Sequence, residues 1–132
     1  GEFCDEVEII DCLNSIINSI KIKIEKEIDT NIESIRSYIN ENFLQEISLD
    51  VLESLFQIDK FKLIRRFKKL YNTTPSAYQL QLKVDCSKQL MKTEHDLASV
   101  ALASGFYDQA HFTREFKKTT GMTPRYYMLS MK

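Results

Sequence analysis

The clearest structural signal in the chain lies at residues 101–118, which read ALASGFYDQAHFTREFKK. Asp96 is placed to cap a short helix, and Gly105 can end that helix because glycine readily adopts a left-handed backbone. Asp108 can cap a second helix that turns Phe112 toward the interior. Two short helices joined by a tight turn are typical of a helix-turn-helix unit.

A second unit of the same outline precedes it, at about residues 48–72. Ser48 can cap a short helix that ends near Phe56, and Asp59 can cap the helix that follows. The residues of that later helix expected to face inward are Leu63, Phe67 and Leu70. The sequence therefore predicts two helix-turn-helix units, the later one at about residues 96–121.

A long uninterrupted helix is predicted between the two units. Thr74 is an N-cap followed by Pro75 at the first helical position, and no breaker occurs before about Lys92. These 18 residues would rise about 27 Å. Thr123-Pro124 repeats this helix start after Gly121. We expect an all-α fold in which a long central helix joins two helix-turn-helix subdomains, preceded by an N-terminal amphipathic helix.

The two units repeat each other at an offset of 49 residues. When residues 59–83 are laid over residues 108–132 without gaps, 10 of 25 positions are identical. Core packing explains some identities, such as Phe67 with Phe116. No packing reason explains three of the basic identities, which are Arg65 with Arg114, Lys68 with Lys117, and Lys69 with Lys118. Repeated basic residues on the outward face of a second helix are what a pair of DNA-reading modules needs.

Composition supports a helical protein of one compact domain or two very small ones. The 132 residues are 43% hydrophobic and 28% charged, with 3 glycines and 2 prolines, too few breakers for a loop-rich all-β fold. No run of 18 apolar residues and no signal-peptide pattern occurs, so we expect a cytoplasmic protein without a membrane span. The cysteines form no CxxC pair and only 2 histidines are present, so we expect no metal site, no cofactor and three reduced thiols, at Cys4, Cys12 and Cys86.

Charge is distributed unevenly along the chain. Residues 1–48 hold 4 Lys+Arg against 11 Asp+Glu, a net charge of −7, whereas residues 49–132 hold 14 against 8, a net charge of +6. A basic portion of this kind suits a polyanionic partner. We therefore expect nucleic-acid contacts in the second part of the chain.

The N-terminal part predicts a separate amphipathic helix from Cys4 to about Ile28. Apolar residues recur there at three- and four-residue steps. They are Ile9, Leu13, Ile16, Ile17, Ile20, Ile24 and Ile28. This stripe either packs on its own domain or belongs to a linker or dimerisation helix of a larger protein, and the sequence leaves both readings open.

The domain proper is expected to occupy residues 30–132, because Thr30 and Glu33 have the spacing of a capping box. The apolar face of the helix that follows would be Ile32, Ile35, Ile39 and Phe43. Residues 1–29 would then be the linker or dimerisation helix. Residues 1–3 resemble a cloning scar, and the chain does not begin with Met, so we expect a fragment of a longer protein.

The second unit resembles the DNA-binding domain of the AraC/XylS family of bacterial transcription regulators. Residues 101–118, then Gly121-Met122-Thr123-Pro124 and Tyr127, match the family pattern of IA, GF, DQ, F-x-R-x-FK and G-x-x-P-x-x-Y in order. The resemblance covers about residues 31–131, but Leu52 and Phe56 stand where the family has a small residue and a turn glycine. It implies two helix-turn-helix units that lay their second helices in successive major grooves on one face of DNA. The departure leaves open how deeply the first unit enters its groove.

The resemblance also places base-facing positions on each second helix. They fall on Lys60, Phe61, Ile64 and Arg65 in the first unit, and on Gln109, Ala110, His111, Thr113 and Arg114 in the second. Arg65 and Arg114 can each make a bidentate contact to guanine O6 and N7, and Gln109 can pair with adenine N6 and N7. The alternatives are a phosphate contact or an ion pair with Glu115 or Asp108 for Arg114, edge packing for Phe61, and plain packing for Ile64.

The expected phosphate contacts are lysines on or beside these helices, namely Lys60, Lys62, Lys68, Lys69, Lys117 and Lys118. A lysine-rich helix face is often only solvated, but recurrence in both units favours the phosphate role for Lys68 and Lys117. His111 has no second ligand at metal spacing, which favours a surface or phosphate-facing role over catalysis.

Together these features predict sequence-specific binding of double-stranded promoter DNA by a transcription regulator that is not an enzyme. No Gly-rich phosphate loop, activated nucleophile or carboxylate dyad occurs in the sequence. The family resemblance favours activation through contact with RNA polymerase. The alternative is a helical protein-interaction module with an incidental basic face, which forms a homodimer through residues 4–28 or through an absent N-terminal domain.

Overall fold

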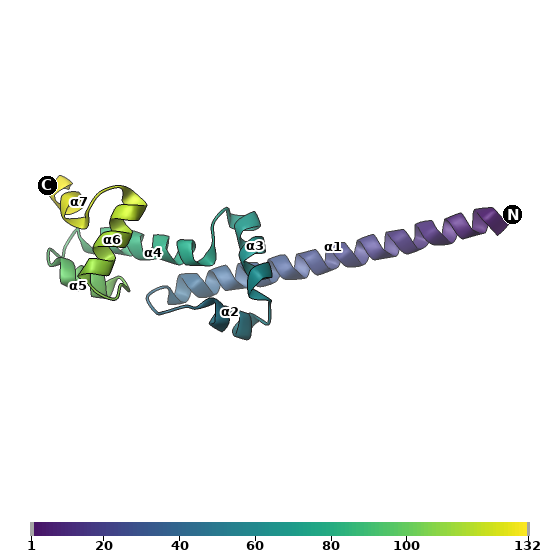
Figure 1. The fold of residues 1–132 in the computed structure, drawn as a ribbon, viewed down its shortest axis with the longest axis horizontal. Helices are drawn as coiled ribbons and strands as arrows, with labels where there is room; N and C mark the ends of the chain where they lie inside the picture. Colours follow the sequence, from purple (N-terminus) through teal and green to yellow (C-terminus); the bar gives the residue numbers. More distant parts are fainter. Residues whose placement is uncertain (1, 132) are drawn as a thin grey trace.

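Helices make up most of the computed structural model, which describes the backbone of residues 2–131 and the side chains of residues 6–131. Within that range there are seven helices and no strand, as the all-α prediction requires. α1 (Glu2–Asn42) is the longest and projects far beyond the other six, which gather at its C-terminal end (Figure 1).

α1 runs without a break through residue 30, where the sequence predicted a new helix. The Thr30 hydroxyl donates to the Lys26 carbonyl oxygen at 2.9 Å, and the Ser34 hydroxyl donates to the Thr30 carbonyl oxygen at 3.1 Å. These bonds reach back one turn inside a helix, so the predicted capping box of Thr30 and Glu33 is wrong. No glycine or proline lies near this point, and nothing interrupts the backbone hydrogen bonds.

The first helix-turn-helix unit is α2 (Leu49–Phe56) and α3 (Lys60–Tyr71), packed against the second half of α1. Asn31 Nδ2 donates to the Phe56 carbonyl oxygen at 3.0 Å, and Arg66 donates to Asp29 Oδ1 from Nε at 3.1 Å and from Nη2. The buried core of this unit consists of Ile32, Ile35, Ile39, Leu52, Ile58, Leu63 and Phe67. The C-terminal half of α1 is therefore an integral wall of the first unit.

Leu70 does not lie in this core, contrary to the prediction for α3. Leu63 and Phe67 are fully buried, but Leu70 is 40% exposed. Tyr71 packs at this end of the helix instead, with its ring centroid 4.9 Å from that of Phe67. Helical periodicity identifies the face that looks inward, but it does not say where the covering elements end.

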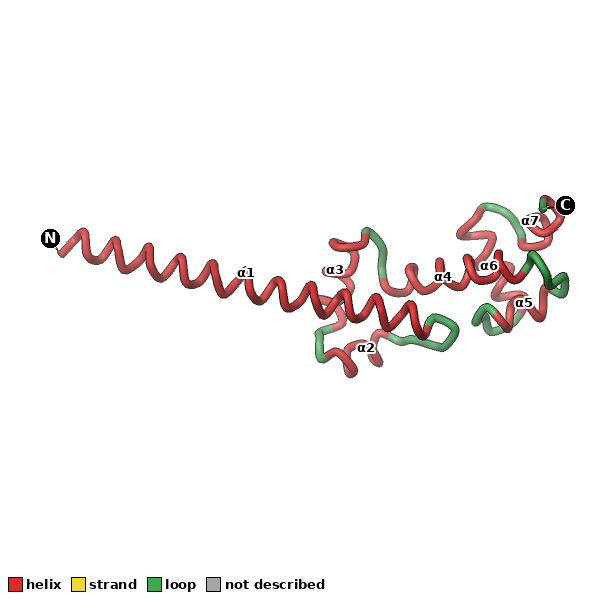
Figure 2. The backbone as a smooth tube through the Cα atoms, turned by 180° about the vertical axis from the view of Figure 1, so that it is seen from behind, coloured by secondary structure: helices red, strands yellow, loops and turns green. Residues whose placement is uncertain are grey.

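The second unit is α5 (Leu97–Ala103) and α6 (Gln109–Thr120), and α7 (Pro124–Ser130) packs against α6. Its core consists of Val84, Met91, Leu97, Val100, Ala101, Phe106, Phe112 and Phe116. α4 (Pro75–Leu90) joins the two units and contributes side chains to both cores. α3 lies beside the start of α4 and α6 beside its later part (Figure 2).

Local capping fixes the start of every helix after α1, as predicted. The side chain of each predicted cap accepts a hydrogen bond from a backbone N–H in the first turn. The caps are Ser48, Asp59, Thr74, Asp96, Asp108 and Thr123. α4 has 16 residues and ends two residues before Lys92, so it rises about 24 Å.

The turns of the two units differ in length. The left-handed residue is Gln57 in the first turn (φ 49°) and Gly105 in the second (φ 89°). One residue, Ile58, separates Gln57 from the N-cap of α3, whereas two separate Gly105 from the N-cap of α6. Leu52 is buried without disrupting the unit, so its departure from the family pattern is absorbed in the core.

The N-terminal part of α1 is not buried by the rest of the domain. Residues 6–27 are all exposed, and the large apolar side chains of the stripe lie open to solvent there. Of the two alternatives that the sequence left open, this exposure favours a linker or dimerisation helix over packing on its own domain.

Candidate nucleic-acid interface

The outward face of α3 carries an aromatic ring and basic side chains. Leu63 and Phe67 anchor the inner face, and at 100° per residue Phe61, Arg65 and Lys68 point the opposite way. All three are exposed, Phe61 by 63%. This face therefore presents Arg65 to solvent between Phe61 and Lys68.

α6 presents the matching face in the second unit. Phe112 and Phe116 are fully buried, and Ala110, Arg114 and Lys117 lie opposite them and are exposed. Gln109 is exposed in the first turn, and Thr113 is half-buried at the edge of the face. The offset of 49 residues thus brings Arg65 and Arg114 to equivalent places on two helices.

Neither Arg65 nor Arg114 forms an ion pair within the described residues, where the salt bridges are Lys60–Asp50 and Arg66–Asp29. The alternative that Arg114 is held by Glu115 or Asp108 is therefore not realised. Asp108 is occupied as the N-cap, since its Oδ1 accepts the backbone N–H of His111 at 2.7 Å. Both guanidinium groups remain available to an external acceptor.

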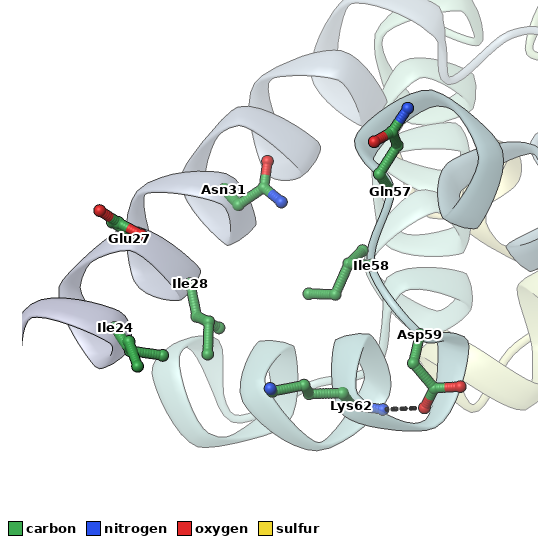
Figure 3. A pocket seen from close by; sticks show the side chains of 8 residues that line it. All are labelled: Ile24, Glu27, Ile28, Asn31, Gln57, Ile58, Asp59 and Lys62. Atoms are coloured by element: carbon green, nitrogen blue, oxygen red, sulfur yellow. Dashed lines mark hydrogen bonds between the residues drawn. The ribbon is translucent and has the colours of Figure 1, made fainter. Parts of the chain in front are cut away.

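The six predicted phosphate lysines fall into two groups. The exposed ones in the last turns of α3 and α6 are Lys68, Lys69, Lys117 and Lys118. Lys60 is half-buried and pairs with Asp50 at 3.5 Å. Lys62 lies on the side of α3 that faces α1, in a groove with Ile24 and Ile28 (Figure 3). The last-turn lysines are thus better placed for phosphate contact.

His111 and Ile64 are partly engaged inside their units. The His111 ring lies edge-on to Phe106 with centroids 5.5 Å apart, and its Nδ1 accepts a hydrogen bond from the Tyr107 backbone N–H at 3.4 Å. Ile64 is half-buried beside Leu63. The structure therefore brings Phe61, Arg65, Gln109, Ala110 and Arg114 fully to the surface and leaves His111, Thr113 and Ile64 at its margin.

Sequence reasoning missed Tyr107 as a candidate contact. This residue precedes the N-cap of α6 and is 85% exposed, the most exposed large hydrophobic side chain on the described surface. Its position after Gly105 and Phe106 gave no periodic signal, because it lies in the turn rather than on a helix. A tyrosine at this place can donate a hydrogen bond to a phosphate beside the first turn of the helix.

Other kinds of site find no support in the described part of the chain. No group of three or more His, Cys, Asp or Glu side chains there is placed to hold a metal ion. Cys12 and Cys86 are free thiols, and the side chain of Cys4 lies outside the described residues. None of the helices from residue 2 to residue 131 is long and apolar enough to cross a bilayer.

Comparison with known families and proteins also identifies a helix-turn-helix domain in this chain. Residues 52–129 match the model of a helix-turn-helix domain family. The bifunctional transcriptional activator/DNA repair enzyme AdaA of Bacillus subtilis is 30% identical over 94 residues, which cover 70% of this chain and 44% of AdaA. The chain spans 34%, 44% and 50% of the lengths of three such curated relatives.

Two solved structures show the same fold. The DNA-binding domain of AdpA in complex with a target DNA has a TM-score of 0.68 at 18% identity, and the match covers 75% of this chain and 90% of that one. A probable AraC family transcriptional regulator of Rhodopseudomonas palustris has a TM-score of 0.67 at 20% identity, with coverage of 78% and 98%. Both comparisons show that the fold of this chain is shared with these two structures.

Proposed function

Because this chain belongs to the AraC/XylS family of helix-turn-helix transcription regulators, we propose that it binds double-stranded promoter DNA sequence-specifically. The observation that carries the proposal is the pair of outward faces on α3 and α6, each with an unpaired arginine at the equivalent position. The likeness to AdaA and to the DNA complex of AdpA supports the same class of partner.

In this proposal base recognition rests on three side chains. Arg65 and Arg114 each contact a guanine through O6 and N7, and Gln109 pairs with an adenine. Each such contact discriminates against a wrong base by about 1–3 kcal/mol. Phe61, Ala110 and Thr113 make apolar contacts of the kind that suits a thymine methyl group, and His111 contributes at the edge.

Phosphate contacts position the domain on the duplex. Lys68, Lys69, Lys117 and Lys118 are exposed in the last turns of the two helices and supply the main attraction. Two lysines contribute less to the attraction for DNA. Lys60 forms an ion pair with Asp50, and Lys62 lies on the side of α3 that faces α1. Tyr107 adds one contact beside α6.

The two helices read neighbouring segments of the major groove. α4 spans about 24 Å, and with the widths of the two units added the separation approaches the 34–36 Å of one DNA turn. One chain then covers a non-palindromic site whose two parts lie about 10 base pairs apart. We assign this role to residues 30–132, with Asp29 and Asn31 as the junction to the projecting helix.

The proposed cellular role is activation of transcription in the bacterial cytoplasm, with RNA polymerase as a second partner. AdaA carries the name of an activator, and the present chain spans less than half of it. The repair activity in that name is not carried over, because the proposed function of this chain is DNA binding without catalysis.

We further propose that the projecting part of α1 pairs with a second copy of this chain. Ile10, Leu13, Ile17, Ile20 and Ile24 follow one another in alternating steps of three and four residues and are 49–59% exposed. This is the heptad spacing by which two identical helices pack, with isoleucine at each a position. Two copies would thereby place two DNA-binding domains on one promoter.

The salt dependence of DNA binding tests the main proposal and separates it from the protein-interaction alternative. With four lysines on phosphates, the logarithm of the association constant should fall with the logarithm of salt concentration with a slope of about −4. Binding titrations with random-sequence duplex at several salt concentrations measure this slope. Absence of DNA binding at low salt, with self-association intact, would leave the interaction module as the function.

A further inference from the structure

We propose that the loop between α1 and α2, residues 43–48, clamps the two helix-turn-helix units together and so fixes the spacing at which α3 and α6 meet DNA. This inference rests on the proposed function for its DNA consequence, but the clamp itself is a property of the protein alone. The loop contacts the first unit through Ile47, which packs against its core, and it also contacts α4 and the turn of the second unit.

Gln79 on α4 holds the loop from one side. Its Nε2 donates to the Phe43 carbonyl oxygen at 3.0 Å and to the Gln45 carbonyl oxygen at 2.8 Å. Only the amide nitrogen of glutamine can donate twice, so this orientation of the side chain is fixed by its partners. Two backbone carbonyls of the loop are thereby tied to the connecting helix.

Gly105 receives the loop in the turn of the second unit. A Cβ atom at Gly105 would lie 3.0 Å from the Leu44 carbonyl oxygen and 3.1 Å from Leu44 Cα, so a side chain there would require the Leu44 backbone to shift by a few tenths of an ångström. Two features therefore favour glycine over other residues at position 105. They are the left-handed φ of 89° and the close approach of Leu44.

Lys83 completes the contact one helical turn after Gln79. Its Cε lies 3.3 Å from the position of a Gly105 Cβ, and its Nζ lies 5.8 Å from the centroid of the Phe106 ring. Burial lowers the pKa of Lys83, and the negative charge of Glu46 in the loop opposes that shift. Gln79 and Lys83 thus lie on one face of α4 and join the loop to the second turn.

The clamp matters because the two cores share no buried residue. Leu82 and Tyr78 of α4 pack against the first core, whereas Val84 of α4 belongs to the second core and Leu80 packs against it. Without the loop, α4 would be the one connection between the units. A second connection through the loop restrains rotation of one unit about α4 relative to the other. The positions of Arg65 and Arg114 relative to each other then depend on residues that touch no DNA.

The test uses the variant Q79A with K83A in the full chain, and Q81A as a matched control. Gln81 lies on the same helix but is exposed and bonds only to Asp85 of α4. Backbone residual dipolar couplings, measured without DNA, report the relative orientation of the units. The wild type and Q81A should fit a single alignment tensor, and Q79A with K83A should need two.

The DNA readout is the penalty for changing the spacing of a selected site by one base pair. Such a change rotates one half-site by about 34–36° and shifts it by about 3.4 Å. The wild type and Q81A should lose about tenfold or more in affinity, as for a mismatched base pair. The clamp variant should lose less than about threefold, with the base preference of each half-site unchanged.

The outcomes separate the clamp from the proposed function. The clamp would be refuted if the dipolar couplings of the wild type needed two alignment tensors, or if those of the clamp variant fitted one. This holds whether or not the chain binds DNA. An unchanged spacing penalty in the clamp variant would overturn the clamp while leaving DNA binding in place. A chain that binds no DNA would overturn the proposed function, and the dipolar couplings would still decide the clamp.

Discussion

Replacing Arg114 with alanine tests base reading by the second unit most sharply. Arg114 is exposed on α6 and has no ion-pair partner within the described residues, so its removal breaks no bond that holds the fold. We expect a change in unfolding free energy within about 0.5 kcal/mol, as for other surface substitutions. The bound state should lose the bidentate guanine contact, about 1–3 kcal/mol, or 5- to 150-fold in affinity.

Fluorescence anisotropy with four duplexes, the selected one and its three base variants at one position, measures this effect. Arg114→Ala should bind the four duplexes with similar affinity, whereas the wild type prefers guanine. Lys117→Ala, one turn along the same face, is the matched control, because loss of a phosphate contact weakens all four duplexes equally. Retention of the full guanine preference by Arg114→Ala would refute base reading by this residue and assign it to phosphate.

Three further predictions follow from core packing, capping and the projecting helix. Phe116→Ala should lower the free energy of unfolding by about 3–5 kcal/mol in denaturant titration, because the ring is fully buried beside Phe112 and Tyr127; a cost below 1 kcal/mol would contradict that packing. Asp108→Ala should cost about 1 kcal/mol through loss of the α6 N-cap, measured by thermal unfolding, whereas Asp108→Asn should be nearly neutral. Removal of residues 1–24 should abolish self-association in sedimentation equilibrium and leave the circular dichroism melting temperature of the domain in place; a fully monomeric intact chain would contradict the pairing of α1.

Helix limits were predictable where they depend on local chemistry. A Ser, Thr or Asp directly before a segment with helical periodicity predicts that the helix begins there. The N-caps of α2 to α7 confirm this. Thr30 shows the limit of the same reasoning. A threonine with a glutamate three residues later also fits the middle of a helix, where its hydroxyl bonds back to the preceding turn.

The candidate contact faces were predictable because they follow from helical periodicity and from the repeat. What the sequence could not show are pairings made by tertiary placement. Lys60 meets Asp50 only because α2 turns back on α3, and Gln79 meets Phe43 across 36 positions of the chain. The exposure of Leu70 depends likewise on where the covering elements end. Such contacts carry no periodic signal.

If α3 and α6 of one chain both enter DNA, they should occupy two neighbouring major-groove segments. Hydroxyl-radical footprinting on a site selected from random DNA measures this. We expect two protected segments on one face of the duplex, about 10 base pairs apart, with the stronger base preference in the half contacted by Gln109 and Arg114. A single protected segment per chain would contradict it, because only one of the two helices would then meet the groove.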